Sequence, residues 1–323
     1  MGHNGRDIHH EEAMMGSTEV TLVGVDGSKE SLAAVKWAAD RAIRFGGRVH
    51  VLCTYALASY SAAALDGGYA VLDDEALKRG AQQVVEEAVE IAKSRGEVRV
   101  SSSIEPGDPA GVLVEMSREV DLVVVGSRGG GSFADRLLGT VSSALPAHAQ
   151  CPVVVVPRHT AGKKFMPVER IVVGVDGSEV PSSALRKAVD EAEGWGARLT
   201  AVSAVPIGSG TSMMAWTPNV DHSALLDNVR KGMGEAIDQA LHGRTMEVAR
   251  HALDGAPASL LIEFSTAVDL VVVGTRSRGG LAGVLLGSTS QTVLSHSTCP
   301  VMIVPSDHLG KAESAAAPDW GRR

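Results

Sequence analysis

The sequence predicts an α/β fold in which two tandem domains share one design, and three observations support this prediction. The chain has 323 residues, which exceeds the size at which a single hydrophobic core usually stops growing. Blocks of the first half return in the same order in the second half. Within each half, short runs rich in β-branched residues alternate with longer helical patterns, as in parallel strands joined by helices.

The repeat consists of four matched blocks. The pairs are TLVGVDGS (21–28) with IVVGVDGS (171–178), DLVVVGSR (121–128) with DLVVVGTR (269–276), LLGTVSS (137–143) with LLGSTSQ (285–291), and CPVVVVP (151–157) with CPVMIVP (299–305). The first pair is offset by 150 residues and the others by 148, so the two copies differ little in length. We therefore interpret the chain as two copies of one domain.

In the first copy we expect five strands and four helices, in alternating order. The strands lie near 20–26, 48–56, 97–105, 121–126 and 153–157, and the helices near 29–45, 73–95, 108–119 and 139–149. Apolar runs such as LVVVG do not alternate with polar residues, which is typical of strands covered on both faces. Right-handed crossovers then give the strand order 3-2-1-4-5 in each of two doubly wound, five-stranded, Rossmann-like parallel sheets.

Helix start signals agree with these elements. Asp108 supplies an N-cap and Pro109 a proline for the first helical turn, and Pro257 stands at the same place in the second copy. We assign Ser28 and Ser178 to capping the helix that follows the first strand of each copy.

The predicted boundaries follow from the repeat. Residues 1–19 form a disordered tail, 20–157 the first domain, 158–169 a polar linker, 170–305 the second domain and 306–323 a second disordered tail. The linker is too short to let the copies separate widely, so we expect them to pack together.

Composition limits the partners. A net charge of −8 and an aromatic content of 3% argue against nucleic acid, which needs clustered basic residues or stacking platforms. No run of eighteen apolar residues exists and the N-terminus lacks the apolar core of a signal peptide, so we expect a cytoplasmic protein that does not span a membrane. The three cysteines, Cys53, Cys151 and Cys299, fit a reducing compartment and small buried side chains.

Unusual residues follow the first and fourth strands, between which a sheet of this order has its ligand-binding switch point. Asp26 and Asp176 follow the first strand of each copy, and the glycine-rich loop GSRGGGSFADRLLGT (126–140) follows the fourth. A carboxylate accepts hydrogen bonds from ribose hydroxyls or base nitrogens. Glycines let backbone N–H groups approach phosphate oxygens, and the start of the next helix favours an anion. Arg128 adds positive charge there.

Other interpretations of these residues remain open. In these interpretations the loop is no more than a turn, Asp26 is no more than a helix N-cap, and Arg128 and Arg276 are no more than solvated surface charges. Two familiar nucleotide loops are excluded for residues 126–140. A P-loop is excluded because this loop contains no Gly-Lys pair, and a dinucleotide fingerprint is excluded because the glycine pattern follows the fourth strand rather than the first.

The motifs resemble those of the universal stress protein family in its tandem-domain form, over roughly 20–157 and 170–305. ATP-binding members of that family carry Gly-x2-Gly-x9-Gly-[Ser/Thr] after the fourth strand, and Gly126, Gly129 and Gly139 with the residue that follows match every position. The resemblance implies ATP, alone or with Mg²⁺, as the ligand. It also implies contacts from the Asp after the first strand, from the two residues before it and from the end of the second strand. The candidate binding residues are Gly24, Val25, Asp26, Thr54, Gly126, Arg128, Gly129, Gly139, Thr140 and Ser142 in the first copy, and Gly174, Val175, Asp176, Ala204, Gly274, Arg276, Gly279, Gly287, Ser288 and Ser290 in the second.

The second copy departs from the motif at one position. Ser277 stands where the second glycine is expected, and Gly279 is the candidate that takes over its role. If the position requires a positive φ, serine costs ~1–2 kcal/mol. We therefore expect two sites of unequal strength.

The resemblance also implies function and assembly. It indicates a nucleotide-dependent regulator in stress or dormancy. We expect no catalytic or metal-ligating residues, because neither loop carries a Walker lysine, no repeated His stands near a loop and no carboxylate pair recurs at metal-ligand spacing. The alternatives are a slow ATPase or nucleotide hydrolase and a scaffold with empty sites. The family pairs domains along the last strand, which is short, apolar and exposed at a sheet edge in each copy, so we expect a pseudo-dimer within the chain and a homodimer through edge strands.

Overall fold

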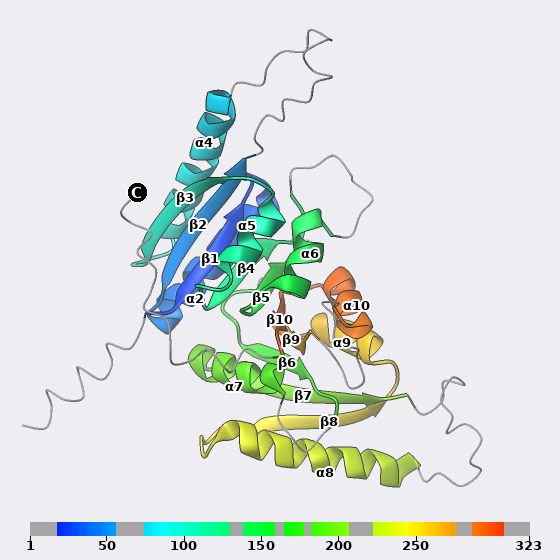
Figure 1. Cartoon of the computed structure of the whole chain (residues 1–323). Coiled ribbons are helices and arrows are strands. Elements are labelled where there is room, and N and C mark those ends of the chain that lie inside the picture. The colour runs from blue at the N-terminus through cyan, green and yellow to red at the C-terminus, as the bar shows by residue number, and fades with distance from the viewer. Residues whose placement is uncertain are drawn as a thin grey trace, which may run out of the picture.

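The computed structural model describes residues 18–55, 74–129, 138–158, 165–177, 182–206, 222–275 and 286–306. Its strands form one ten-stranded sheet in the order β3-β2-β1-β4-β5-β10-β9-β6-β7-β8 (Figure 1). The first five strands of this order belong to the first copy and the last five to the second. Each copy therefore has the predicted order 3-2-1-4-5, and its strands are parallel.

The elements of the two copies follow one another in the same order. The first copy contains β1 (Val20–Val25), α2 (Lys29–Phe45), β2 (Arg48–Tyr55), α4 (Asp74–Lys93), β3 (Arg99–Pro106), α5 (Pro109–Met116), β4 (Leu122–Gly126), α6 (Thr140–His148) and β5 (Val153–Val156). The second contains β6 (Arg170–Gly174), α7 (Ser183–Trp195), β7 (Arg198–Val205), α8 (His222–Leu241), β8 (Val248–Asp254), α9 (Pro257–Ser265), β9 (Leu270–Gly274), α10 (Ser288–His296) and β10 (Val301–Val304).

Helices cover both faces of the sheet, which explains the uniformly apolar central strands. Helices α2, α4, α7 and α8 pack on one face, and α5, α6, α9 and α10 pack on the other (Figure 1). Each face carries a hydrophobic core that contains residues of both copies. The three cysteines are buried in these cores, as expected.

The two copies join through their last strands. Strands β5 and β10 pair antiparallel, with Val154 opposite Met302, so the predicted pseudo-dimer within the chain is confirmed. Because these two strands pair with each other, the outer strands of the sheet in the described part of the chain are β3 and β8.

The helix starts agree with the sequence except at one point. The side chain of Ser28 accepts a hydrogen bond from the Ser31 N–H and caps α2, as predicted. In the second copy α7 begins one turn later, with Ser182 as its N-cap. The assignment of Ser178 to this cap was therefore wrong. The sequence offers a reason, since Pro181 disfavours helical geometry in the residue before it.

The folded part includes two residues that the sequence places in the N-terminal tail. Thr18 accepts a hydrogen bond from Arg99 at 3.1 Å. Glu19, which the sequence places in the tail, accepts a hydrogen bond from the Arg48 N–H at 2.9 Å and pairs with Arg41 at 2.9 Å. Among the described helices, none is long and apolar enough to cross a membrane.

Candidate functional site

A cavity of about 300 Å³ opens where β1 and β4 end side by side. Strand β2 and helices α2, α5 and α6 contribute its remaining walls. All ten candidate residues of the first copy line this cavity, together with Ser31, Leu52, Pro109, Leu113, Val125, Leu138 and Val141. Residues that are far apart in the sequence are thus brought together at the switch point. Their contact with a nucleotide remains a prediction.

Asp26 lies at the end of β1 and is held by the start of α2. Its Oδ1 accepts hydrogen bonds from the Ser28 N–H at 3.0 Å and from the Ser28 hydroxyl at 2.6 Å. Ser28, not Asp26, is the N-cap of α2, so Asp26 is not merely a cap. The capped helix instead fixes the orientation of a carboxylate that lines the cavity.

Two glycines of the loop let neighbouring atoms approach the loop backbone closely. A Cβ on Gly126 would lie 2.6 Å from the Glu30 carbonyl carbon and 2.8 Å from the Ser31 nitrogen, which are backbone atoms of α2. A Cβ on Gly129 would overlap Asp26 Oδ2. Gly126 therefore lets α2 pack against the end of β4, and Gly129 leaves room for the Asp26 carboxylate.

The sequence suggests a positive φ as one reason for the second glycine of the motif, but Gly129 does not adopt one. The φ of Gly129 lies outside the left-handed region, and Gly139 has a φ of −76°. The first-copy motif thus needs glycine at 129 because of the neighbouring Asp26 side chain, not because of backbone conformation. A similar close approach occurs at Gly24, where a Cβ would lie 3.0 Å from Leu113 Cδ1 of α5.

Helix α6 presents its N-terminus to the cavity. Gly139 is the N-cap, and among the described residues no side chain caps this helix. Orphan N–H groups and the helix dipole make such an end suitable for an anion. Thr140 is exposed and lines the cavity. Ser142 is buried, and its hydroxyl donates to the Ser127 carbonyl at 2.7 Å, so it braces the helix against β4.

The remaining wall is mostly apolar. Leu52, Leu113 and Val125 are buried and line the cavity beside Thr54 and Pro109. Of these, the sequence predicted only Thr54. Their apolar character was visible, but only the strand order and the packing of α5 show that they face this space. Such a surface suits a flat, largely apolar ring system.

The thiol of Cys53, which precedes the cavity residue Thr54, is protonated at neutral pH. Burial, and then the negative charge of Asp26, raise the pKa of Cys53 to about 11. Cys53 precedes Thr54 on β2 and packs in the core on the opposite face. It is therefore a poor nucleophile at neutral pH.

The second copy repeats part of this arrangement. The Gly287 N–H donates to the Thr275 carbonyl at 2.7 Å, and the Ser290 hydroxyl donates to the Gly274 carbonyl at 2.6 Å, as Gly139 and Ser142 brace α6. Ser288 begins α10. Ala204 replaces Thr54 and removes a hydroxyl.

Two second-copy candidates, Arg276 and Gly279, lie outside the described residues, as does Ser277. Gly174 ends β6, where a Cβ would lie 2.9 Å from Leu261 Cδ1. A cavity of about 10 Å³ touches Val175 and Asp176, but its other walls come from α7 and α8. It therefore lies on the face opposite to α9 and α10 and does not correspond to the first-copy cavity.

The fold and the site define the class of protein: a tandem, doubly wound α/β protein with a ligand-sized cavity at the switch point of its first sheet. The family model for the universal stress protein family matches residues 18–157 and 167–305. The chain belongs to the universal stress protein family.

Curated relatives match this chain over most of their own length. Universal stress protein Rv2005c of Mycobacterium tuberculosis is 34% identical over 290 residues, covering 87% of this chain and 95% of the relative. Universal stress protein Rv2623 of the same organism is 33% identical over 298 residues, with the same coverage. The crystal structure of a universal stress protein from Archaeoglobus fulgidus is similar in fold, with a TM-score of 0.64 and 21% identity over 90% of this chain and 97% of that chain.

Proposed function

We propose that this chain binds ATP in the cavity of its first copy, and that occupancy regulates a cytoplasmic response to stress or dormancy. The observation that carries the proposal is the cavity between β1 and β4, which combines a carboxylate, an apolar wall and an uncapped helix N-terminus among the described residues. The regulatory role rests on membership of the universal stress protein family.

The parts of a nucleotide match the parts of the cavity. Leu52 and Leu113 offer apolar surface to the base, and Asp26 offers acceptors to the ribose hydroxyls. The α6 N-terminus, the Thr140 hydroxyl and the positive charge of Arg128 suit the phosphates, or phosphates with Mg²⁺. Charge-assisted hydrogen bonds contribute ~1.5–3 kcal/mol each, so a few of them support micromolar affinity after the costs of binding.

The proposed role is binding rather than catalysis. The loop lacks the lysine that P-loop enzymes place on the phosphates, and binding accounts for Asp26. Slow hydrolysis of ATP and a scaffold with empty sites are the alternatives, and each gives a different result in the binding and turnover measurements described below.

We propose that the second-copy site is the weaker one. Ser277 replaces the second motif glycine, and Ala204 replaces Thr54. In the first copy the equivalent of Ser277 is Gly129, where even a Cβ would overlap the Asp26 carboxylate. A homodimer of the chain would use the outer strands β3 or β8, because β5 and β10 already pair.

The proposal is tested by titrating ATP into Asp26→Asn and Asp176→Asn variants, with calorimetry as the readout. Asn retains one acceptor oxygen for Ser28, removes the negative charge and replaces the second oxygen with an N–H donor group. We expect Asp26→Asn to weaken the tighter site about tenfold, and Asp176→Asn to leave that site within about twofold of wild type. Equal losses in both variants, or no binding by the wild type, contradict the proposal. Turnover of ATP by the wild type supports the hydrolase alternative instead.

A further inference from the structure

Residues that contact their own equivalents mark the axis that relates the two copies. Val154 pairs with Met302, which is its equivalent at the offset of 148. The ring centroid of Phe45 lies 5.7 Å from that of Trp195, its equivalent at the offset of 150. A residue that meets its own equivalent lies on the pseudo-two-fold axis. Helices α2 and α7 therefore face each other across this axis.

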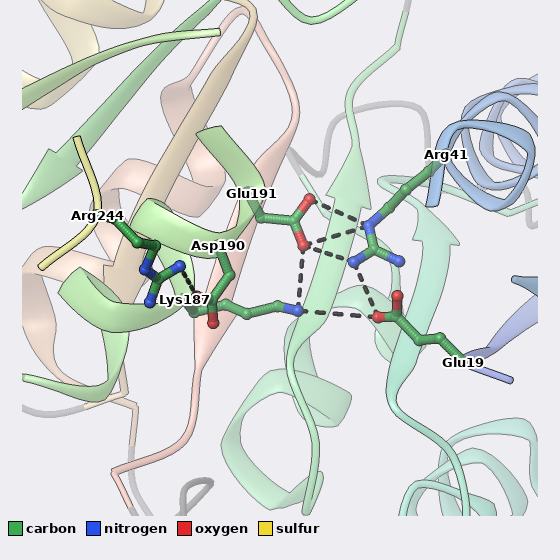
Figure 2. Close-up of polar contacts among 6 residues, drawn as sticks. All are labelled: Glu19, Arg41, Lys187, Asp190, Glu191 and Arg244. Atoms are coloured by element: carbon green, nitrogen blue, oxygen red, sulfur yellow. Dashed lines mark hydrogen bonds and ion pairs between the residues drawn. The ribbon is translucent and has the colours of Figure 1, made fainter. Parts of the chain in front are cut away.

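Arg41 and Glu191 also lie on the axis, but they carry opposite charges. They are equivalents at the offset of 150. The Arg41 Nε lies 3.2 and 3.1 Å from the two carboxylate oxygens of Glu191, and Arg41 Nη2 lies 2.6 Å from Oε1 (Figure 2). Both side chains are buried, with 1% and 0% of their surfaces exposed.

Two further charges complete the cluster. Glu19 accepts a hydrogen bond from Arg41 at 2.9 Å, and Lys187 lies 3.1 Å from Glu191 (Figure 2). Burial opposes ionisation of Glu191, but the charges of Arg41 and Lys187 outweigh it and lower the Glu191 pKa to about 2. Glu191 is therefore ionised at physiological pH, and the axis carries one positive and one negative charge.

If two first copies, or two second copies, paired about the same axis, the axis would no longer carry one positive and one negative charge. Two first copies would place Arg41 against Arg41, and two second copies would place Glu191 against Glu191. Each charge would then keep only the partner from its own copy, Glu19 or Lys187, while facing a buried like charge. Buried charges that lose a partner are strongly destabilising.

A steric feature acts in the same direction. Gly194 lies against the ring of Phe45, and a Cβ on Gly194 would overlap that ring. The first-copy equivalent of Gly194 is Arg44, so two first copies would bring the Arg44 side chain onto Phe45. In the chain as it is, Arg44 donates to the Gly194 carbonyl at 2.7 Å.

We propose that Arg41 and Glu191 make this interface selective for the unlike copy. A first copy pairs with a second copy, within one chain or by exchange of halves between two chains, and like copies do not pair. Such selectivity uses a repulsive element against the wrong partner as well as an attractive one for the right partner.

The full chain itself can carry the like-charged arrangements. Glu191→Arg places arginine opposite arginine, as two first copies would, and Arg41→Glu places glutamate opposite glutamate, as two second copies would. We expect each variant to lower the melting temperature by about 10 °C. The double variant Arg41→Leu/Glu191→Leu removes both axis charges and leaves Glu19 and Lys187, 3.8 Å apart, to pair with each other. We expect it to melt within about 3 °C of wild type, because apolar replacement of a buried ion pair is often tolerated.

Lys36→Glu is the matched control, because it reverses an exposed charge on the same helix and should change the melting temperature by less than about 2 °C. If the like-charged variants are recovered only as aggregate while the Leu/Leu variant folds, the proposal is supported equally. Like-charged variants that melt as high as wild type overturn it. A Leu/Leu variant that loses as much stability as they do also overturns it, since the pair would then serve the fold itself rather than the choice of partner.

Discussion

At the scale of single residues, the candidate site depends on one carboxylate and the space beside it. The sequence identified Asp26 and Gly129 as separate candidates, 103 positions apart. It could not show that Gly129 matters because of Asp26, since this contact arises only when β1 and β4 lie next to each other. The same holds for Leu52 and Leu113, whose apolar side chains looked like ordinary core residues.

Replacement of Gly129 tests this contact. In Gly129→Ala the new Cβ would overlap Asp26 Oδ2, so the carboxylate must move. We expect the dissociation constant for ATP to rise about tenfold, while the melting temperature changes little. Gly80→Ala on α4, whose Cβ would meet nothing within 4 Å, is the control for the substitution itself. Unchanged affinity in Gly129→Ala would show that Asp26 does not contact the nucleotide.

A second residue-scale prediction concerns pH. His50 is buried between the hydroxyls of Ser101 and Ser103, each 2.9 Å from a ring nitrogen. Burial, and then the charge of Arg48, lower the His50 pKa to about 4. The unfolded chain therefore takes up this proton near pH 6.5 and the folded chain only near pH 4. The stability contribution is complete above pH 6.5 and is lost as the pH falls from 6.5 towards 4.

We expect the free energy of unfolding to be about 2 kcal/mol lower at pH 5 than at pH 7 because of this residue. Urea unfolding at the two pH values measures the difference. In His50→Gln the difference should shrink by that amount. If His50→Gln shows the same pH dependence as wild type, titratable groups other than His50 cause the loss of stability at pH 5.

At the scale of elements, most of the first copy followed from the sequence. Apolar runs and helix start signals placed its strands and helices within about two residues at most ends, because buried parallel strands and proline-started helices have distinctive patterns. The predicted cap of α7 was wrong because the repeat suggested Ser178, whereas Ser182 is the N-cap and the helix begins at Ser183, after Pro181 in the sequence. Local chemistry outweighed the similarity of the two copies.

The different caps lead to an element-scale prediction. Ser28 caps α2 and also holds Asp26, whereas Ser182 caps α7. Both Ser28→Ala and Ser182→Ala should cost about 1 kcal/mol of stability, measured by urea unfolding. Only Ser28→Ala should also weaken ATP binding, by about threefold to tenfold. Equal effects of both variants on binding would remove the link between the α2 cap and the site.

At the scale of the whole molecule, the two copies act as one folded unit. The sheet is continuous through β5 and β10, and both hydrophobic cores contain residues of both copies. The sequence suggested the pairing from two short apolar edge strands. The charge pair at its centre was not apparent, because Arg41 and Glu191 become partners only about the axis.

We therefore expect a single cooperative unfolding transition. Circular dichroism reports all helices and strands, and tryptophan fluorescence reports the four tryptophans of the chain. Two of these, Trp37 and Trp195, have ring centroids 6.4 Å apart across the interface. The two probes should give coincident urea curves. Two separated transitions, with fluorescence changing first, would show that the copies separate before they unfold.

We propose that the first copy holds ATP more tightly than the second. The most direct measurement is mass spectrometry of the nucleotide released when freshly purified protein is denatured, counted per chain for wild type, Gly129→Ala and Asp176→Asn. We expect ATP to be bound to the wild type, retained in Asp176→Asn and largely lost in Gly129→Ala. The same nucleotide content in Gly129→Ala as in wild type, or none in any of the three proteins, would contradict it.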